Sequence, residues 1–244
     1  MKDTALVVPL YEEKDAVGPL VAEIAAHWRG GEVVFVDDGS TDGTAERVAA
    51  AAAAAGIAHR VVRHGRNRGV GAAMRTGFAA ARGGSVVVYD ADRPYPLADA
   101  RRLVDALERA DVATASPWHE EGGAPGVGPI RALLSRAASF LYRLVLGRGA
   151  RGIRTFTCAF RAYRRPALDR IEFRSDGFLA AAEILALALR AGLRVEEVPS
   201  TLRARTEGRS KMRVVRTAGA HGRLLARLLA ARLFPRSAPR EALS

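Results

Sequence analysis

The first half of the chain alternates short runs rich in β-branched residues with helical patterns, and this alternation limits the possible folds most strongly. The predicted strands are Thr4–Val8, Glu32–Val36, His59–Arg63 and Ser85–Tyr89. The predicted helices are Ala16–Trp28, Thr44–Ala55, Gly71–Ala81 and Leu97–Ala110. Strands joined through helices at this spacing form right-handed βαβ units. The sequence therefore predicts an α/β fold with a Rossmann-like, mainly parallel sheet and flanking helices.

The second half is organised differently. A loop dense in glycine and proline, Pro117–Pro129, leads into it. Helices are predicted at Ile130–Leu146, Phe178–Ala191 and Val214–Phe234, and strands at Cys158–Tyr163 and Val195–Val198. We expect a single domain over residues 1–235, with one functional half at 1–115 and another at 116–235. Residues 236–244 are expected to form a flexible tail.

The positive charge is concentrated in the second half. The net charge is +12 over the whole chain, +15 over residues 121–244 and −3 over residues 1–120. Such asymmetry predicts an anionic partner, either nucleic acid or an anionic membrane. An arginine-rich coding bias would explain the choice of arginine but not its distribution. No aromatic stacking platform or nucleic-acid motif is recognised, so nucleic acid is not expected.

Cysteine content and hydropathy bear on location. The single cysteine, Cys158, excludes an internal disulfide framework and is expected to be a small packing residue. The apolar stretch Thr4–Pro9 is too short for a signal peptide. No apolar run approaches the roughly 18 residues of a spanning helix. The expected location is cytoplasmic, peripheral at the inner membrane face.

Polar or glycine-bearing residues follow each predicted strand of the first half. The four segments are Val8–Glu13, Val36–Thr44, Arg66–Ala73 and Tyr89–Asp92. Open α/β sheets bind ligands at the carboxyl ends of their strands. Each segment alone has a plain structural explanation: Asp42 can cap a helix, and Gly69 to Gly71 can form a tight turn. All four in this order favour a binding site.

Asp90 and Asp92 form the chemical centre of this pattern. They lie two residues apart, so in an extended strand they share a face. Two close carboxylates repel unless a cation lies between them, and hard oxygen ligands favour Mg²⁺ or Mn²⁺ bound to phosphate. Solvated loop acids are the alternative. The apolar run Val86–Tyr89 places the pair at the mouth of a buried strand, which favours metal.

The motifs resemble those of the family two glycosyltransferases, which have the nucleotide-diphosphosugar transferase (GT-A-like) fold. Val8–Glu13 is similar to the family's V-P-x-Y-N-E, Asp37–Thr44 to D-D-G-S-T-D-G-T, and Asn67–Ala72 to N-x-G-x-G-A. In the second half, Thr157–Arg165, Glu197–Pro199 and Arg205–Lys211 are similar to the S-G-F-R-x-Y-R-R, E-V-P and R-x-x-G-x-S-K of the dolichyl-phosphate mannose synthase group.

The resemblance implies inverting transfer of a hexose from GDP-mannose or a UDP-sugar to a polyprenyl phosphate. Residues 1–115 would then be the donor half and 116–235 the acceptor half. Asp90 and Asp92 would hold Mg²⁺ or Mn²⁺. The residues implied for donor binding are Pro9, Tyr11, Glu13, Asp38, Ser40, Gly69 and Ser210. The cations implied for the diphosphate and the acceptor phosphate are Arg131, Arg205 and Lys211.

The helix predicted near the end of the chain is basic and amphipathic. Arg216, Arg223 and Arg227 share one face, and the leucines form a stripe opposite or beside it: Leu225, Leu228, Leu229 and Leu233. Such a helix can lie in a membrane interface or pack on the sheet with solvated arginines. The sequence leaves both possibilities open.

Three departures from the polyprenyl-phosphate branch stand beside the resemblance. Arg93-Pro94 replace the usual Leu-Gln, and Ala115–Pro117 lack the arginine of G-S-R. Thr155 stands where that branch has an acidic residue, and Ala159 replaces a glycine. These departures favour an alternative, transfer to a soluble acceptor such as a secondary metabolite. A second alternative is a non-catalytic nucleotide-binding relative. The intact Asp90-Ala91-Asp92, which resembles the family's metal-binding acidic triplet, argues against it.

Overall fold

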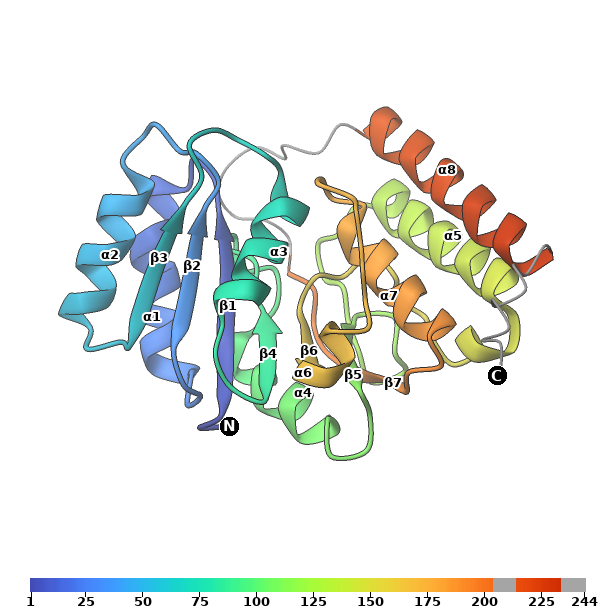
Figure 1. Cartoon of the computed structure of the whole chain (residues 1–244), viewed down its shortest axis with the longest axis horizontal. Coiled ribbons are helices and arrows are strands. Elements are labelled where there is room, and N and C mark those ends of the chain that lie inside the picture. Colours follow the sequence, from blue (N-terminus) through green and yellow to red (C-terminus); the bar gives the residue numbers. More distant parts are fainter. Residues whose placement is uncertain (204–213, 234–244) are drawn as a thin grey trace, which may run out of the picture.

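The computed structural model describes residues 1–203 and 214–233. Within them, seven strands form one sheet in the order β3-β2-β1-β4-β6-β5-β7. Every strand is parallel to its neighbours except β6, which is antiparallel to β4 and β5 (Figure 1). The strands are β1 Thr4–Leu10, β2 Val33–Asp37, β3 His59–Arg63, β4 Ser85–Val88, β5 Val112–Ser116, β6 Arg161–Arg164 and β7 Val195–Pro199.

Helices cover both faces of the sheet. In chain order they are α1 Val17–His27, α2 Thr44–Ala54, α3 Val70–Ala80, α4 Ala100–Ala106, α5 Pro129–Leu146, α6 Arg165–Leu168, α7 Ala180–Arg190 and α8 Val214–Leu233, with 3₁₀ turns at Lys14–Ala16, Leu97–Asp99 and Gly147–Ala150. Helices α1, α2 and α4 pack on one face, and α3, α6 and α7 on the other. Helices α5 and α8 lie side by side beyond α7 (Figure 1).

The core follows from strand periodicity. Along β2, Val33 and Phe35 face one apolar cluster while Val34 and Val36 face the other, and all four are fully buried. A parallel sheet covered on both faces requires this continuous apolar run. Cys158 is also buried, and burial raises the pKa of its thiol to about 12, so a packing role fits it.

The predicted fold class is confirmed, and the main departures from the predicted elements lie after β4. Strand β5 was not predicted because Val112–Ser116 is rich in alanine rather than in large β-branched residues. The strand predicted at Cys158–Tyr163 begins at Arg161 and runs antiparallel. The helix predicted at Leu97–Ala110 divides into a 3₁₀ turn and α4. The tail at 236–244 lies outside the described residues.

A third apolar cluster joins α5, α7 and α8. Tyr142 stacks on Phe156 with ring centroids 4.9 Å apart, and Leu224 and Leu228 of α8 are buried beside them. Part of the leucine stripe of α8 is therefore packed against protein, whereas Leu233 remains 62% exposed. Among the described residues, no helix is both long and apolar enough to cross a membrane.

Candidate active site

The loops after β1 and β2 are tied together by hydrogen bonds. The Glu12 amide donates to Ser40 Oγ (2.9 Å), and the Thr41 amide donates to Glu12 Oε1 (2.7 Å). The Glu13 amide donates to Thr44 Oγ1 (2.9 Å), and Glu12 adopts a left-handed backbone with φ +52°. A non-glycine residue holds that conformation only where its surroundings fix it. Ser40, predicted to contact the donor, thus fixes the shape of this loop pair.

Asp38 is buried, and three groups engage its carboxylate. The Arg68 amide and His64 Nδ1 lie 2.9 and 2.7 Å from Oδ1, and the Gly69 amide donates to Oδ2 at 2.7 Å. The second ring nitrogen of His64 lies 2.9 Å from Thr76 Oγ1. Sequence reasoning missed His64, which has no motif of its own. Asp38 therefore fixes the backbone of the glycine-containing loop at Arg68 and Gly69.

Asp37 is the second acid at the end of β2 and points to the opposite face of the sheet. Its Oδ2 lies 3.3 Å from the Ser40 amide. Its Oδ1 is buried without a hydrogen-bond partner in the part of the chain that the structure describes. A buried, unsatisfied acceptor needs an explanation, and a ligand donor is one. Strand alternation predicts that Asp37 and Asp38 point to opposite faces, but it does not show which of the two faces a ligand.

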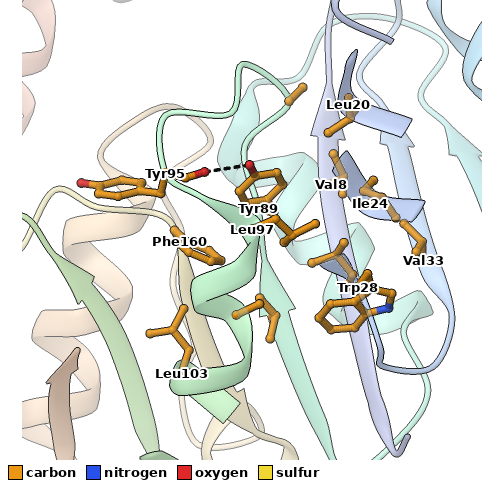
Figure 2. Packing of buried hydrophobic residues seen from close by; sticks show 14 of the residues in the cluster. Val8, Leu20, Ile24, Trp28, Val33, Tyr89, Tyr95, Leu97, Leu103 and Phe160 are labelled. Atoms are coloured by element: carbon orange, nitrogen blue, oxygen red, sulfur yellow. Dashed lines mark hydrogen bonds between the residues drawn. The ribbon is translucent and has the colours of Figure 1, made fainter. Parts of the chain in front are cut away.

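The acidic turn Asp90–Asp92 follows β4 directly, and both carboxylates are half-buried. The Arg93 amide donates to the Asp90 carbonyl (3.1 Å), which closes the turn. Beneath it, the Tyr89 hydroxyl donates to the Tyr95 carbonyl (2.8 Å), and Tyr95 stacks on Phe160 (Figure 2). Packed aromatic side chains therefore support the acidic turn.

The donor set of this turn fits a divalent cation. Magnesium and manganese bind through one or two carboxylates and complete their shell with water and phosphate oxygens. The described residues contain no group of three or more acidic, histidine or cysteine side chains that could hold a metal by themselves. Two aspartates at a strand end match a site that is completed by a phosphate ligand.

Arg131 lies in the first turn of α5 and is exposed. Burial is the main cause that raises the pKa of the Tyr95 hydroxyl, followed by Cys158 and the charge of Asp90, while Arg131 opposes the rise. The charges of Asp90 and Arg131 thus act in opposite directions on the same side chain.

The glycine motif at the start of α3 is occupied by the protein itself. The Asp176 carbonyl accepts from the amides of Gly71 (2.6 Å) and Ala72 (3.4 Å). A Cβ on Gly71 would overlap the Ser175 carbonyl oxygen, and Gly69 adopts φ +98°. These glycines therefore permit close contact with the segment before α7. Gly69 was predicted to bind donor, and in the structure it serves this contact and Asp38.

The departures at Pro117 and Thr155 lie close together in space. Ser116 Oγ and Thr155 Oγ1 form a buried hydrogen bond of 2.6 Å. Beside them, Glu197 Oε1 accepts from the amides of Arg154 (2.8 Å) and Thr155 (2.7 Å). Burial raises the pKa of the Glu197 carboxyl despite these bonds. Thr155 thus places a neutral hydroxyl where the polyprenyl-phosphate branch has an acidic residue, and Pro117, next to Ser116, stands where that branch has an arginine.

The segment after β7 returns to the acidic turn. The Leu202 amide donates to the Gly123 carbonyl (2.8 Å), and the Arg203 amide donates to the Pro94 carbonyl (2.8 Å). Arg203 is the last described residue before position 214. The predicted site residues Arg205, Ser210 and Lys211 lie outside the described residues.

Fold and site together define a class of protein. A seven-stranded, mainly parallel sheet with an acidic turn at the carboxyl end of β4 is the predicted nucleotide-diphosphosugar transferase fold, GT-A-like. The structure of glucosyl-3-phosphoglycerate synthase from Mycobacterium tuberculosis, in complex with Mn²⁺, UDP and glucosyl-3-phosphoglycerate, is similar, with a TM-score of 0.66 and 23% identity. The match covers 97% of this chain and 82% of that chain. At this identity the likeness supports the fold.

The sequence comparisons then identify the family. The model of glycosyl transferase family 2 matches residues 5–172, and the chain belongs to this family. It is 32% identical over 216 residues to polyprenol monophosphomannose synthase of Mycolicibacterium smegmatis, covering 86% of this chain and 80% of that protein. It is 32% identical over 226 residues to dolichol-phosphate mannosyltransferase of Saccharomyces cerevisiae, covering 85% and 80%. The predicted resemblance is confirmed.

Proposed function

We propose that this protein transfers a hexose from a nucleotide diphosphate sugar, GDP-mannose or a UDP-sugar, to a polyprenyl phosphate at the cytoplasmic membrane face, with inversion. The observation that carries the proposal is the pair of carboxylates in the acidic turn Asp90–Asp92, at the carboxyl end of β4. The cation Arg131 lies on α5, a helix whose outer face is apolar. Relatives named for polyprenol and dolichol phosphates support the acceptor class.

The donor nucleoside is assigned to the loops after β1 and β2. Tyr11 and Glu13 line this site together with Pro9 and Ser40, and Asp37 supplies a buried oxygen that lacks a partner in the described chain. Guanine and uracil both present ring N–H donors, so a carboxylate acceptor suits either base. Both carboxylate oxygens of Asp38 already have hydrogen-bond partners, so Asp38 supports the site indirectly, by holding the Gly69 amide in place.

Asp90 and Asp92 are the residues that would hold Mg²⁺ or Mn²⁺ with the donor diphosphate. A bound divalent cation supplies neutralisation of the charge that develops on the leaving diphosphate. The complex of the structural relative with Mn²⁺ and UDP is consistent with this assignment. If Asp90 and Asp92 were replaced, the turn would have no carboxylate side chains to bind the cation.

The acceptor phosphate needs positioning rather than a base. A phosphate monoester has a second pKa near 6, so it is largely a dianion at pH 7. Its oxygen attacks the anomeric carbon, the bond from that carbon to the diphosphate oxygen breaks, and the nucleoside diphosphate leaves with the electron pair. No proton is transferred. Arg131 is assigned to the acceptor phosphate because a guanidinium binds phosphate through two parallel hydrogen bonds. Arg205, Ser210 and Lys211 remain further candidates.

The outer face of α5 supports contact with a membrane. Six large apolar side chains on this helix are 45–75% exposed: Ile130, Leu133, Leu134, Phe140, Leu141 and Leu144. Scattered exposed apolar residues are ordinary, but a continuous stripe marks an interaction surface. Exposed arginines lie on the same helix at 131 and 136, and on the neighbouring α8 at 223 and 232. Exposed apolar and basic side chains on neighbouring helices suit an anionic lipid interface.

A soluble acceptor is the second candidate. The departures at Pro117 and Thr155 favour it, because this chain lacks the arginine and the acidic residue that the resembling branch has at these positions. The structural relative, named for 3-phosphoglycerate, was solved with its soluble phosphorylated product.

Transfer assays separate these functions. Purified protein is incubated with labelled GDP-mannose, UDP-glucose or other nucleotide sugars, with Mn²⁺ or with EDTA, and with polyprenyl phosphate or 3-phosphoglycerate. We expect Mn²⁺-dependent label in the lipid phase, and none with Asp92→Ala. Label only on the soluble acceptor would replace the lipid proposal. Wild-type protein that neither binds nor turns over any donor would favour a non-catalytic role.

A further inference from the structure

Arg93, the residue that follows the acidic turn, has an unusual backbone. Its φ is +51°, in the left-handed region that residues with a Cβ rarely adopt. Such a conformation is strained and persists only where the surroundings hold the residue in place. Glycine would adopt the same conformation without strain. We therefore expect the arginine side chain to make contacts that hold the backbone in this conformation.

The side chain of Arg93 reaches into the protein rather than into solvent. It is 25% exposed, and its Nη1 lies 3.8 Å from Oε2 of Glu23, whose side chain is 14% exposed. Nε of Arg93 is buried and has no hydrogen-bond partner among the described residues. A mostly buried charge that loses its partner is strongly destabilised, so each member of this pair holds the other in place.

Glu23 holds the far end of the same segment. Its Oε1 accepts from the Leu97 amide (2.9 Å), so one carboxylate of α1 contacts residue 93 and residue 97. Between them, the Tyr95 carbonyl accepts from the hydroxyl of Tyr89, the residue just before Asp90 (Figure 2). Burial raises the pKa of that hydroxyl, and the charge of Glu23 adds to the rise. Glu23, Arg93 and Tyr89 thus gather under the acidic turn.

We propose that Glu23 and Arg93 are positioning residues that fix the Asp90–Asp92 turn in its metal-binding geometry. The proposal rests on the proposed function, in which this turn holds Mg²⁺ or Mn²⁺. The Arg93 amide closes the turn on the Asp90 carbonyl, and Glu23 contacts the Arg93 side chain and the Leu97 amide, so both ends of the segment that follows the turn are held by one carboxylate. Neither residue touches the metal. Arg93 stands where the resembling branch carries the leucine of Leu-Gln.

The test separates the effect of the Arg93 backbone conformation from the effect of the contact between the Arg93 and Glu23 side chains. Arg93→Gly keeps the left-handed backbone without strain and deletes the guanidinium. Glu23→Gln keeps an acceptor for the Leu97 amide and deletes the charge. Mn²⁺ affinity is measured by electron paramagnetic resonance of free Mn²⁺, with GDP or UDP present, at a temperature where circular dichroism shows every variant folded. Groups that hold metal ligands in place typically change affinity by about 10–100-fold, and we expect a loss in that range for both variants.

Three controls make the outcome specific. Asp92→Ala should abolish Mn²⁺ binding. Glu32→Gln breaks a comparable ion pair with Arg60 (2.6 Å) at the start of β2 and should leave Mn²⁺ affinity unchanged. The double variant Glu23→Gln/Arg93→Gly should bind Mn²⁺ no more weakly than either single variant, because the two residues act as one unit.

The outcomes are distinguishable. If wild-type protein binds Mn²⁺, Asp92→Ala does not, and Arg93→Gly binds as wild type does, the positioning role is overturned while the metal site stands. If Glu32→Gln weakens binding as much as Glu23→Gln, the effect is general stability and the inference also fails. Wild-type protein that binds no Mn²⁺ with either nucleotide would overturn the metal site itself, and the positioning role with it.

Discussion

At the scale of single residues, the two aspartates at the end of β2 have different tasks although they are neighbours in one motif. Asp38 accepts hydrogen bonds from the amides of Arg68 and Gly69, whereas Asp37 keeps a buried oxygen without a partner in the described chain. The motif predicted that this strand end binds a ligand. It did not show which carboxylate faces the ligand, because that depends on contacts with a loop 30 residues away.

Substituting each aspartate should separate the two tasks. Asp37→Asn should weaken nucleoside diphosphate binding about tenfold or more, since a hydrogen bond to a charged group contributes roughly 1.5–3 kcal/mol. Asp38→Asn should instead lower the free energy of unfolding by about 1–3 kcal/mol, because its amide cannot accept from every donor. Isothermal titration with GDP and UDP, together with urea denaturation, measures both. The assignment of Asp37 is contradicted if its variant binds nucleotide as wild type does.

Glu197 should make stability depend on pH. Burial raises the pKa of its carboxyl, so the folded state holds more protons than the unfolded state at pH values above the usual glutamate pKa. Stability then falls as pH rises through this window. Glu197→Gln should remove this fall and raise Tm near pH 7, as followed by circular dichroism from pH 4 to 8. An unchanged pH profile would show that the carboxyl ionises as it does in the unfolded chain.

At the scale of elements, periodicity predicted the helices well and said little about what they cover. The predicted helix Ile130–Leu146 matches α5, and Val214–Phe234 matches α8 within one residue. The sequence reading placed the apolar stripe on α8, yet Leu224 and Leu228 are buried while the exposed large apolar residues lie mainly on α5. An amphipathic pattern shows that a helix has an apolar face. Only the packing of α8 on α5 and α7 decides which face remains outside.

The contact between α5 and α8 should weaken in acid. Tyr142 Oη lies 2.8 Å from His221 Nδ1, and burial lowers the pKa of this histidine. Below the ordinary histidine pKa of about 6.5, the unfolded state binds the proton more readily, so stability falls as pH falls. His221→Phe should flatten the profile between pH 5 and pH 7. Thermal melts across that range test this, and Tyr142→Phe separates the effect of the hydrogen bond from that of the charge.

At the scale of the whole molecule, the sheet takes strands from both halves of the chain, so the residues proposed for the donor and for the acceptor share one scaffold. The sequence predicted the parallel part because each βαβ unit is local. The antiparallel strand β6 between β4 and β5 depends on contacts between distant segments, which no local pattern encodes. The charge asymmetry was readable from the sequence. The sequence did not show how the basic residues lie relative to the apolar face of α5.

Membrane binding should depend on that face and on salt. Phe140→Glu should reduce flotation with vesicles that contain phosphatidylglycerol, because it places a charge in the apolar stripe. Phe178→Glu, at a comparably exposed aromatic outside α5, is the matched control and should float as wild type does. Binding should weaken as ionic strength rises, since screening reduces the attraction of arginines to anionic lipid. Equal flotation of both variants would argue against α5 as the contact.

The start of α3 carries a consequence for redesign. In dinucleotide-binding proteins the first amides of such a helix receive a pyrophosphate. Here the amides of Arg68, Gly69, Gly71 and Ala72 all donate to oxygens of the protein itself. Free sulfate or inorganic phosphate would find no open donor among these four amides. An engineer who wished to turn this scaffold into a dehydrogenase would first have to move the Asp176 carbonyl, a change in the backbone that no side-chain substitution at the glycines can achieve.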